Sequence, residues 1–141
     1  MRATATTTVK APVSHVWEVL ADHEGMSDWA PGLKSTLTKE GAGDRNGIGA
    51  VRKLTVGLPA PAIVEEVVAF EPGKRLGYRA LGGVPLKNYH GDVVLREVPD
   101  GTEISYSVIV DKRLPFGEQA VAKVIAKTLL TALARRAKAT A

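Results

Sequence analysis

The sequence contains no cysteine, few aromatic residues and no long apolar segment. Without cysteine the chain can form neither a disulfide framework nor a thiolate metal site, and it has no thiol nucleophile. No run approaches the about 18 apolar residues that would predict a transmembrane helix. The first ten residues, MRATATTTVK, include no apolar core of a signal peptide. We therefore expect no transmembrane segment, and these absences together favour the cytoplasm.

Motifs of several enzyme classes are missing as well. There is no G-x-x-x-x-G-K-[ST] phosphate loop and no G-x-S-x-G nucleophile elbow. The stretch GAGDRNGIG does not open a helix after an apolar strand, so it favours a hairpin turn or a flexible rim over a dinucleotide site. No two histidines have the spacing of a shared metal site, and His15 with Glu18 is more typical of a surface pair. We expect no metal and no cofactor.

The charge balance is basic, but it does not by itself indicate a nucleic-acid partner. The chain has 19 Lys and Arg against 15 Asp and Glu. These basic residues are scattered among acidic ones, and only the tail ARRAKAT is locally basic, which suits the last turns of a helix. A groove for single-stranded nucleic acid needs exposed aromatic residues for stacking, whereas aromatics make up only 5% of this chain. We therefore expect no nucleic-acid partner.

The first thirty residues predict a strand followed by two helices. Arg2 to Lys10 is rich in β-branched residues and lacks a helical period, so we expect a strand there. The following segment has apolar residues at the i, i+3, i+4, i+7 spacing of a helix: Val13, Val16, Trp17 and Leu20. Pro12 suits the first turn of this helix, and a second, short helix should end at Pro31-Gly32.

A two-residue period then predicts a series of six strands. Their ranges are Leu33–Glu40, Ala50–Leu58, Ala62–Glu71, Lys74–Leu81, Lys87–Val98 and Thr102–Asp111. Several connections between them are short and rich in Gly and Pro, which is typical of antiparallel hairpins. No internal repeat or linker interrupts the pattern, so we expect residues 1–141 to form a single domain.

The last predicted element is the longest helix, from about Pro115 to Lys138. Projected at about 100° per residue, one apolar face centres on a group of five residues: Val121, Val124, Ile125, Thr128 and Ala132. Three leucines extend the apolar arc past half the circumference: Leu129, Leu130 and Leu133. Either this helix is covered on several sides within its own domain, or Leu130 and its neighbours meet a partner, such as a second copy in a homodimer.

This order of elements predicts an α+β helix-grip fold. A curved seven-stranded antiparallel sheet can wrap around the long C-terminal helix, while the two short helices after the first strand close one end. Matching stretches accompany the order: DWAPG, GAVRKL, EEVVAFEPGKRLGY, NYHGDVVL and GTEISYSV. Together they resemble the START-like, or Bet v 1-like, superfamily (SRPBCC), and within it the bacterial polyketide cyclase/dehydrase-type proteins. The resemblance covers nearly the whole chain.

The resemblance implies an elongated cavity between sheet and helix that holds a hydrophobic or amphipathic small molecule. It also implies that the short helical connector forms part of the cavity wall or its entrance, where Trp29 would be an apolar plug. The alternative is that Trp29 caps the end of the core, because tryptophan is highly buried on average. The two interpretations are compatible.

Strand parity places an arginine on an apolar face. Arg52 shares its parity with the apolar residues of its strand, Leu54, Val56 and Leu58. A buried arginine needs a carboxylate partner or several carbonyls. The next strand supplies Glu65 and Glu66, which point to opposite faces; strand position and the family pattern favour Glu65. The pair is either an anchor for a polar ligand group or a structural ion pair.

All three tyrosines, Tyr78, Tyr89 and Tyr106, lie on predicted apolar faces, where each hydroxyl needs a partner. The set suits a cavity with apolar walls and a few convergent polar groups. For each tyrosine alone, ordinary core packing is the alternative.

These residues favour a protein that binds a lipophilic small molecule. The expected cavity residues are Trp29, Leu37, Arg52, Leu54, Glu65, Tyr78, Tyr89, Tyr106, Val121, Ile125 and Thr128. An alternative is an aromatase or cyclase-type enzyme acting on a polyketide-like chain, with Glu65 or a tyrosine as its acid-base group. A third hypothesis, a protein-interaction module, rests only on the broad apolar arc of the last helix.

Overall fold

The computed structural model describes residues 2–30, 32–57, 61–84, 88–111 and 118–141. The elements follow the predicted order of a strand, two helices, further strands and a long helix. They are β1 (Arg2–Val9), α1 (Val13–Ala21), α2 (Met26–Trp29), β2 (Lys34–Lys39), β3 (Val51–Thr55), β4 (Ile63–Glu71), β5 (Arg75–Gly82), β6 (His90–Val98), β7 (Gly101–Ile109) and α3 (Glu118–Thr140). The predicted boundaries at Pro31, Leu58, Lys87 and Pro115 lie outside the described residues.

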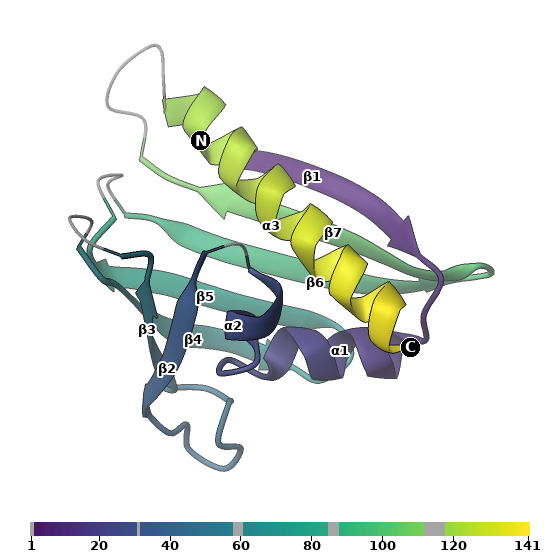
Figure 1. The fold of residues 1–141 in the computed structure, drawn as a ribbon, viewed down its shortest axis with the longest axis horizontal. Helices are drawn as coiled ribbons and strands as arrows, with labels where there is room; N and C mark the ends of the chain where they lie inside the picture. The colour runs from purple at the N-terminus through teal and green to yellow at the C-terminus, as the bar shows by residue number, and fades with distance from the viewer. Residues whose placement is uncertain (1, 31, 58–60, 85–87, 112–117) are drawn as a thin grey trace.

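The strands form one curved antiparallel sheet of seven, in the order β1-β7-β6-β5-β4-β3-β2. The first strand pairs with the last along the whole of β1, and every other neighbour in the sheet is also a neighbour in sequence. The long helix α3 lies across the inner face of this sheet, and α1 and α2 lie at one end (Figure 1). This arrangement confirms the predicted helix-grip fold.

The main core lies between the inner face of the sheet and the helices. Leu76, Val93 and Ile104 point inward from β5, β6 and β7 and are fully buried. Val16 and Leu20 of α1 are buried with them, which confirms the helical spacing read from the sequence. Alternation along each strand therefore separates an apolar inner face from an outer face exposed to solvent.

The face of α3 that packs on the sheet differs from the predicted one. The helix buries mainly small residues and leucines: Ala122, Ala126, Leu130, Leu133 and Ala137. Val121 and Val124, predicted at the centre of the apolar face, are 47% and 64% exposed. Valine is more hydrophobic than alanine, so the sequence favoured the valines as the buried residues. Alanine side chains are small, however, and they let the helix backbone approach the sheet closely. Leu130 is buried in the chain's own core, so this part of the apolar arc is covered within the domain, and a homodimer through α3 stays a prediction.

The strand β3 is shorter than its predicted range, Ala50–Leu58. It ends at Thr55, and Gly57 adopts a positive φ of 95° that turns the chain away. Arg52 and Leu54 are buried on the inner face, as strand parity predicts, but Val56 lies beyond the strand and is exposed. The parity argument holds only as far as the extended backbone continues.

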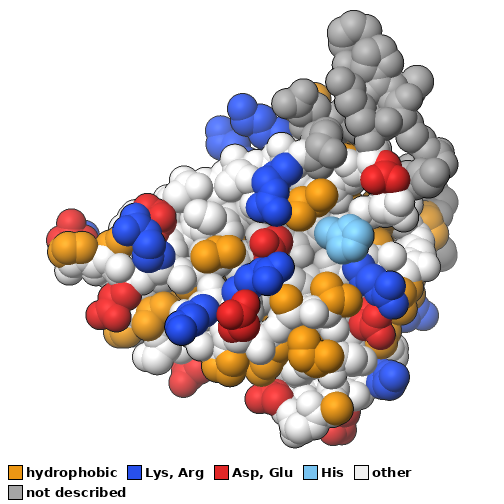
Figure 2. All heavy atoms as spheres, turned by 180° about the vertical axis from the view of Figure 1, so that it is seen from behind, with side chains coloured by type: hydrophobic (Ala, Val, Ile, Leu, Met, Phe, Trp, Pro, Cys, Tyr) orange, Lys and Arg blue, Asp and Glu red, His pale blue; other side chains and the backbone are white. Residues whose placement is uncertain are grey.

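The outer face of the sheet carries paired charges with single apolar side chains between them (Figure 2). The ion pairs join neighbouring strands: Arg75 with Asp92, Arg79 with Glu66, and Arg96 with Glu103. Exposed valines such as Val68 and Val94 lie on the same face. None of the described helices is apolar and long enough to cross a bilayer.

Candidate ligand pocket

A pocket of about 320 Å³ lies between α3 and the inner face of β3, β4 and β5. It is lined by Met26, Leu33, Arg52, Leu54, Ile63, Glu65, Tyr78, Val84, Tyr89, Val121, Val124, Ile125, Thr128 and Leu129. Its walls are almost entirely apolar, and its polar side chains other than Thr128 gather where Arg52, Glu65 and the tyrosines meet. Because Val124 lines the pocket and is largely exposed, the pocket opens to solvent beside α3.

Arg52 and Glu65 form an ion pair at the polar end of this pocket. They lie opposite each other in the register of β3 and β4. Nε and Nη2 of Arg52 each lie 2.8 Å from Oε1 of Glu65, and both side chains are only 4% exposed. Burial is the largest influence and opposes the charge of Arg52, but the Glu65 carboxylate together with Tyr78 and Tyr106 outweighs it, and the pKa of Arg52 is raised. The guanidinium is therefore charged and compensated.

Tyr78 connects this ion pair to the next strands. The guanidinium carbon of Arg52 lies 4.5 Å from the centroid of the Tyr78 ring, a cation–π distance. The Tyr78 ring crosses over Gly91 of β6, where a Cβ atom would overlap it. Its hydroxyl thereby reaches the Tyr106 hydroxyl on β7, at an oxygen–oxygen distance of 2.6 Å. A glycine in the intervening strand is what allows the two tyrosines to meet.

The tyrosines at this end stay protonated. Burial raises the pKa of Tyr78 well above its ordinary value of 10.0, and burial likewise raises the pKa of Tyr89. For Tyr106 burial raises the pKa to about 12, although the neighbouring Arg52 acts in the opposite direction. Near neutral pH all three side chains are therefore uncharged hydroxyl groups that can donate or accept hydrogen bonds.

His23, which sequence reasoning did not identify, completes the polar cluster. It follows α1 and is fully buried. Its Nε2 lies 2.8 Å from the carbonyl oxygen of Asn46, and its Nδ1 lies 3.3 Å from Nη1 of Arg52. Burial, and then the nearby Arg52 charge, lower the pKa of His23 from 6.5 to about 4. Neutral His23 therefore donates from Nε2 to Asn46 and accepts from Arg52 at Nδ1.

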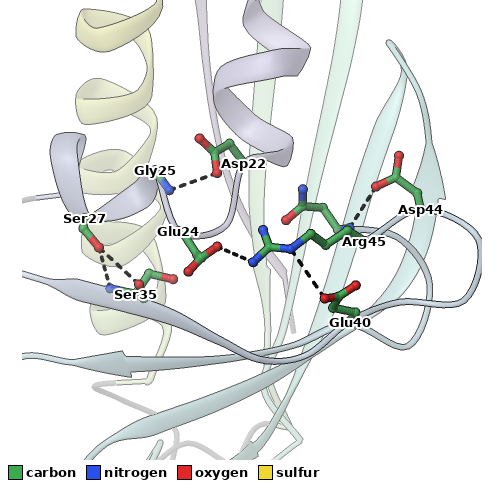
Figure 3. Close-up of polar contacts among 9 residues, drawn as sticks. Asp22, Glu24, Gly25, Ser27, Ser35, Glu40, Asp44 and Arg45 are labelled. Atoms are coloured by element: carbon green, nitrogen blue, oxygen red, sulfur yellow. Dashed lines mark hydrogen bonds and ion pairs between the residues drawn. The ribbon is translucent and has the colours of Figure 1, made fainter.

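The loop between β2 and β3 holds His23 in place. Arg45 in this loop bonds Glu24 at 2.6 Å and approaches Glu40 at 3.8 Å (Figure 3). The backbone of Asn46 donates to Oδ1 of Asp44, which shapes the turn that presents the Asn46 carbonyl. The glycine-rich stretch is therefore a folded loop fastened to the segment after α1. Its link to the site is the backbone carbonyl that His23 reaches.

Eight of the eleven predicted cavity residues line this pocket. They are Arg52, Leu54, Glu65, Tyr78, Tyr89, Val121, Ile125 and Thr128. Strand parity was the main basis for predicting the residues on the sheet, and the apolar arc of α3 was the basis for those on the helix. Val121 and Ile125 point toward the pocket, so they do not belong to the face of α3 that packs on the sheet.

The remaining three predicted residues do not line the pocket but adjoin residues that do. Trp29 packs against the cluster that contains Met26 and Leu54, both of which line the pocket. Its indole Nε1 is buried and has no hydrogen-bond partner among the described residues. Leu37 is half-buried opposite Arg52, and Tyr106 supports Tyr78 from β7. Trp29 thus lies at the core end and next to the pocket wall.

Several residues that line the pocket were not predicted from the sequence. They are Met26, Leu33, Ile63, Val84, Val124 and Leu129. Val124 and Leu129 were on the predicted apolar arc of the helix, so a wider selection along that arc would have included them. Ile63 and Leu33 lie in predicted strands and share the parity of Glu65 and Leu37, so parity would have included them. Met26 and Val84 lie in or beside short connections, where no period shows which side chain points inward.

The histidine near the start of α1 has a partner of its own. Nε2 of His15 lies 2.8 Å from the Thr140 hydroxyl oxygen at the end of α3. Within the described residues, no three His, Asp or Glu side chains gather in a way that could hold a metal ion.

The sequence matches the family model described as polyketide cyclase / dehydrase and lipid transport over residues 1–139. The fold is similar to a START superfamily protein from Mycobacterium smegmatis, with a TM-score of 0.82, 16% identity and 99% of each chain covered. It is also similar to a protein from Thermobifida fusca (TM-score 0.77, 22% identity), covering 96% of this chain and 92% of that one. Ara h 8.0201 gives a TM-score of 0.73 at 17% identity, with 97% of each chain covered. No curated protein matches the sequence.

Proposed function

Because the chain belongs to the polyketide cyclase / dehydrase and lipid transport family, within the START-like / Bet v 1-like superfamily, we propose that it binds an apolar or amphipathic small molecule. The observation that carries this proposal is the pocket of about 320 Å³, whose apolar walls end at one polar cluster. An apolar pocket with a few convergent polar groups is typical of small-molecule sites.

The size of the pocket limits the ligand. A volume of about 320 Å³ is near the lower end of the range for ligand pockets, roughly 300–1,000 Å³. It equals the liquid volume of about ten water molecules. A molecule with one or two fused rings, or a chain of comparable volume, fits this space; a longer chain would extend past Val124 into solvent.

The lining residues divide into two roles in this proposal. Leu54, Val121 and Ile125 provide apolar contact, worth about 0.8 kcal/mol for each buried methylene of the ligand. Arg52, Glu65 and the tyrosines form the end that orients a polar ligand group, with Thr128 on the opposite wall. Trp29, Leu37 and Tyr106 act as neighbours of the lining residues, by holding those side chains in position.

An enzyme of the aromatase or cyclase type is the second candidate, and the tyrosine cluster is the observation that favours it. Tyr78 and Tyr89 line the pocket and could donate a hydrogen bond to a substrate carbonyl. General acid–base catalysis is most efficient when the catalytic pKa lies near the working pH. The raised pKa values of these tyrosines do not meet that condition. We therefore propose binding as the function.

Native mass spectrometry of protein purified without detergent tests the binding proposal. The expected result is a stoichiometric adduct whose mass reappears in an organic extract of the same sample. If the cell supplies no ligand, the apo protein should bind an added apolar ketone of two fused rings, such as 2-acetylnaphthalene. Failure of both measurements would contradict the proposal.

Two tryptophan substitutions provide a matched control for the location. Val124→Trp should obstruct the opening of the pocket and abolish the adduct, because Val124 lines the pocket. Val94→Trp places the same side chain at another exposed valine, on the outer face of the sheet, and should leave the adduct unchanged. Loss of the adduct in both variants, or in neither, would place the ligand elsewhere.

A further inference from the structure

We propose that the pocket selects uncharged ligands with a hydrogen-bond-accepting oxygen, such as ketones, phenols or alcohols, and discriminates against carboxylates and amines. This inference rests on the proposed binding function and adds the chemical class of the ligand. It follows from how the charges and hydroxyl groups at the polar end are already paired.

The charges at the polar end cancel. Arg52 and Glu65 are the only charged side chains among the described residues that line the pocket. They form a buried pair, and both Nε and Nη2 of Arg52 are directed at the same carboxylate oxygen. A ligand with a net charge would add a third charge beside this compensated pair, in a site where burial makes electrostatic interactions stronger than in water.

Arg52 has further partners besides Glu65. Nη1 donates to the neutral His23, and the guanidinium carbon lies 4.5 Å from the centroid of the Tyr78 ring, so three of its five N–H groups are used. A ligand carboxylate would have to approach Arg52 beside Glu65, so it would meet a like charge as well as the cation. An ammonium group would meet Glu65 beside Arg52. In both cases the charged group loses its hydration without gaining an unshared counter-ion.

The tyrosines provide an uncharged alternative. The Tyr78 hydroxyl meets the Tyr106 hydroxyl at 2.6 Å and also hydrogen-bonds Tyr89, so these two contacts use two of the three hydroxyl hydrogens and one remains for a ligand. Tyr78 lines the pocket while Tyr106 does not, and Tyr89 adds another hydroxyl to the wall. A carbonyl or hydroxyl oxygen of the ligand can accept from this group without disturbing the balance of charge.

A panel of four probes with one ring system tests the inference. The probes are 2-acetylnaphthalene, 2-naphthol, 2-naphthoate and 2-naphthylmethylammonium, titrated into the full chain at pH 7 by calorimetry. We expect the ketone and the phenol to bind at least tenfold more tightly than either ion. Equal or tighter binding of the carboxylate or the ammonium would overturn the inference while supporting the binding function. No binding of any probe at millimolar concentration would contradict both.

Glu65→Gln reverses the expected selectivity. This variant keeps the shape of the side chain but leaves the charge of Arg52 uncompensated, so 2-naphthoate should gain at least tenfold in affinity relative to the ketone. Glu66→Gln is the matched control, because Glu66 is the next residue and pairs with Arg79 on the outer face. In Glu66→Gln the ratio of the affinities for 2-naphthoate and the ketone should equal that of the wild type. An unchanged ratio in Glu65→Gln, or the same change in both variants, would overturn the inference.

Circular dichroism shows whether Glu65→Gln folds. If it does not, the titrations of the four probes into the wild-type protein still test the inference. The buried pair then remains intact, and the order of affinities alone supports or overturns the selection of uncharged ligands.

Discussion

Two adjacent glutamates on β4 form ion pairs that are almost the same in geometry and opposite in surroundings. On the inner face, Nε and Nη2 of Arg52 both lie 2.8 Å from Glu65. On the outer face, the same two atoms of Arg79 lie 2.9 and 2.8 Å from Glu66. The side chains of the inner pair are 4% exposed, whereas Arg79 and Glu66 are 51% and 23% exposed.

The difference shows that distance alone does not decide what an ion pair does. Water competes for the outer pair, so its net contribution to stability is small. The inner pair is shielded from water, which makes each charge depend on its partner and lets the pair determine the electrostatics of the pocket. Substitutions of neighbouring residues on the two faces test this contrast.

The largest expected effect is on the ion pairs themselves. Glu65→Gln should lower the free energy of unfolding by about 3–5 kcal/mol, because it leaves the Arg52 charge buried without its carboxylate. Glu66→Gln should lower it by less than about 1 kcal/mol, as for other exposed pairs. Urea unfolding monitored by circular dichroism measures both. Equal losses would show that burial does not distinguish the two pairs.

The next effect concerns pH and His23. Its pKa is about 4 in the folded protein, below the ordinary 6.5, so the unfolded chain binds the proton more readily. The stabilisation from neutral His23 is therefore complete above pH 6.5 and is lost as the pH falls to 4, by about 3 kcal/mol.

Urea unfolding at pH 7 and pH 4 measures this loss. His23→Gln should lose about 3 kcal/mol less than the wild type over this range. His90→Gln, a substitution on the outer face, should lose as much as the wild type. The same pH dependence in His23→Gln and wild type would contradict the assigned role of His23.

A glycine-to-alanine substitution tests the close packing over β6. Gly91→Ala should destabilise the protein by about 1–3 kcal/mol, because its Cβ would overlap the Tyr78 ring. It should also weaken ligand binding, since Tyr78 must move. Gly82→Ala on β5 meets open space and should change stability by less than about 1 kcal/mol. Thermal unfolding of both variants is the measurement; a harmless Gly91→Ala would contradict the placement of Tyr78.

The smallest expected effect comes from single hydroxyl groups. Tyr106→Phe removes the hydrogen bond to Tyr78 and should cost about 0.5–1.5 kcal/mol of stability. Ser105, the preceding residue, shares an exposed contact with Thr6, and Ser105→Ala should stay within about 0.5 kcal/mol of the wild type. Urea unfolding resolves the two. A larger loss of stability for Ser105→Ala than for Tyr106→Phe would contradict the expected difference between the two faces.

Much of this contrast could be predicted from the sequence, because alternation in a strand is a local property. Parity placed Arg52 and Tyr78 on apolar faces and put Glu65 and Glu66 on opposite faces; strand position and the family pattern then favoured Glu65 for the inner one. In the structure the antiparallel register brings Arg52 opposite Glu65. The order of elements was sufficient to predict the fold class for the same reason, because the change between a helical and a two-residue period can be read within a short stretch of sequence.

The parts that could not be predicted depend on contacts between distant segments. His23 is buried because the loop between β2 and β3 folds onto it, and no local pattern reports that contact. The buried face of α3 depends on how closely the helix approaches the sheet, which favours Ala122 and Ala126 over Val124. Trp29 was expected at the cavity, but how it packs follows from the neighbouring Met26 and Leu54.

The most direct test of the central claim, that the inner face holds the ligand, is a methyl-detected NMR titration with 2-acetylnaphthalene. The account predicts chemical-shift changes and intermolecular nuclear Overhauser effects at four pocket residues: Leu54, Ile63, Ile125 and Leu129. The valines of the outer face, Val64, Val68 and Val94, should not respond. Binding that perturbs these outer methyls and leaves the pocket methyls unchanged would contradict the account.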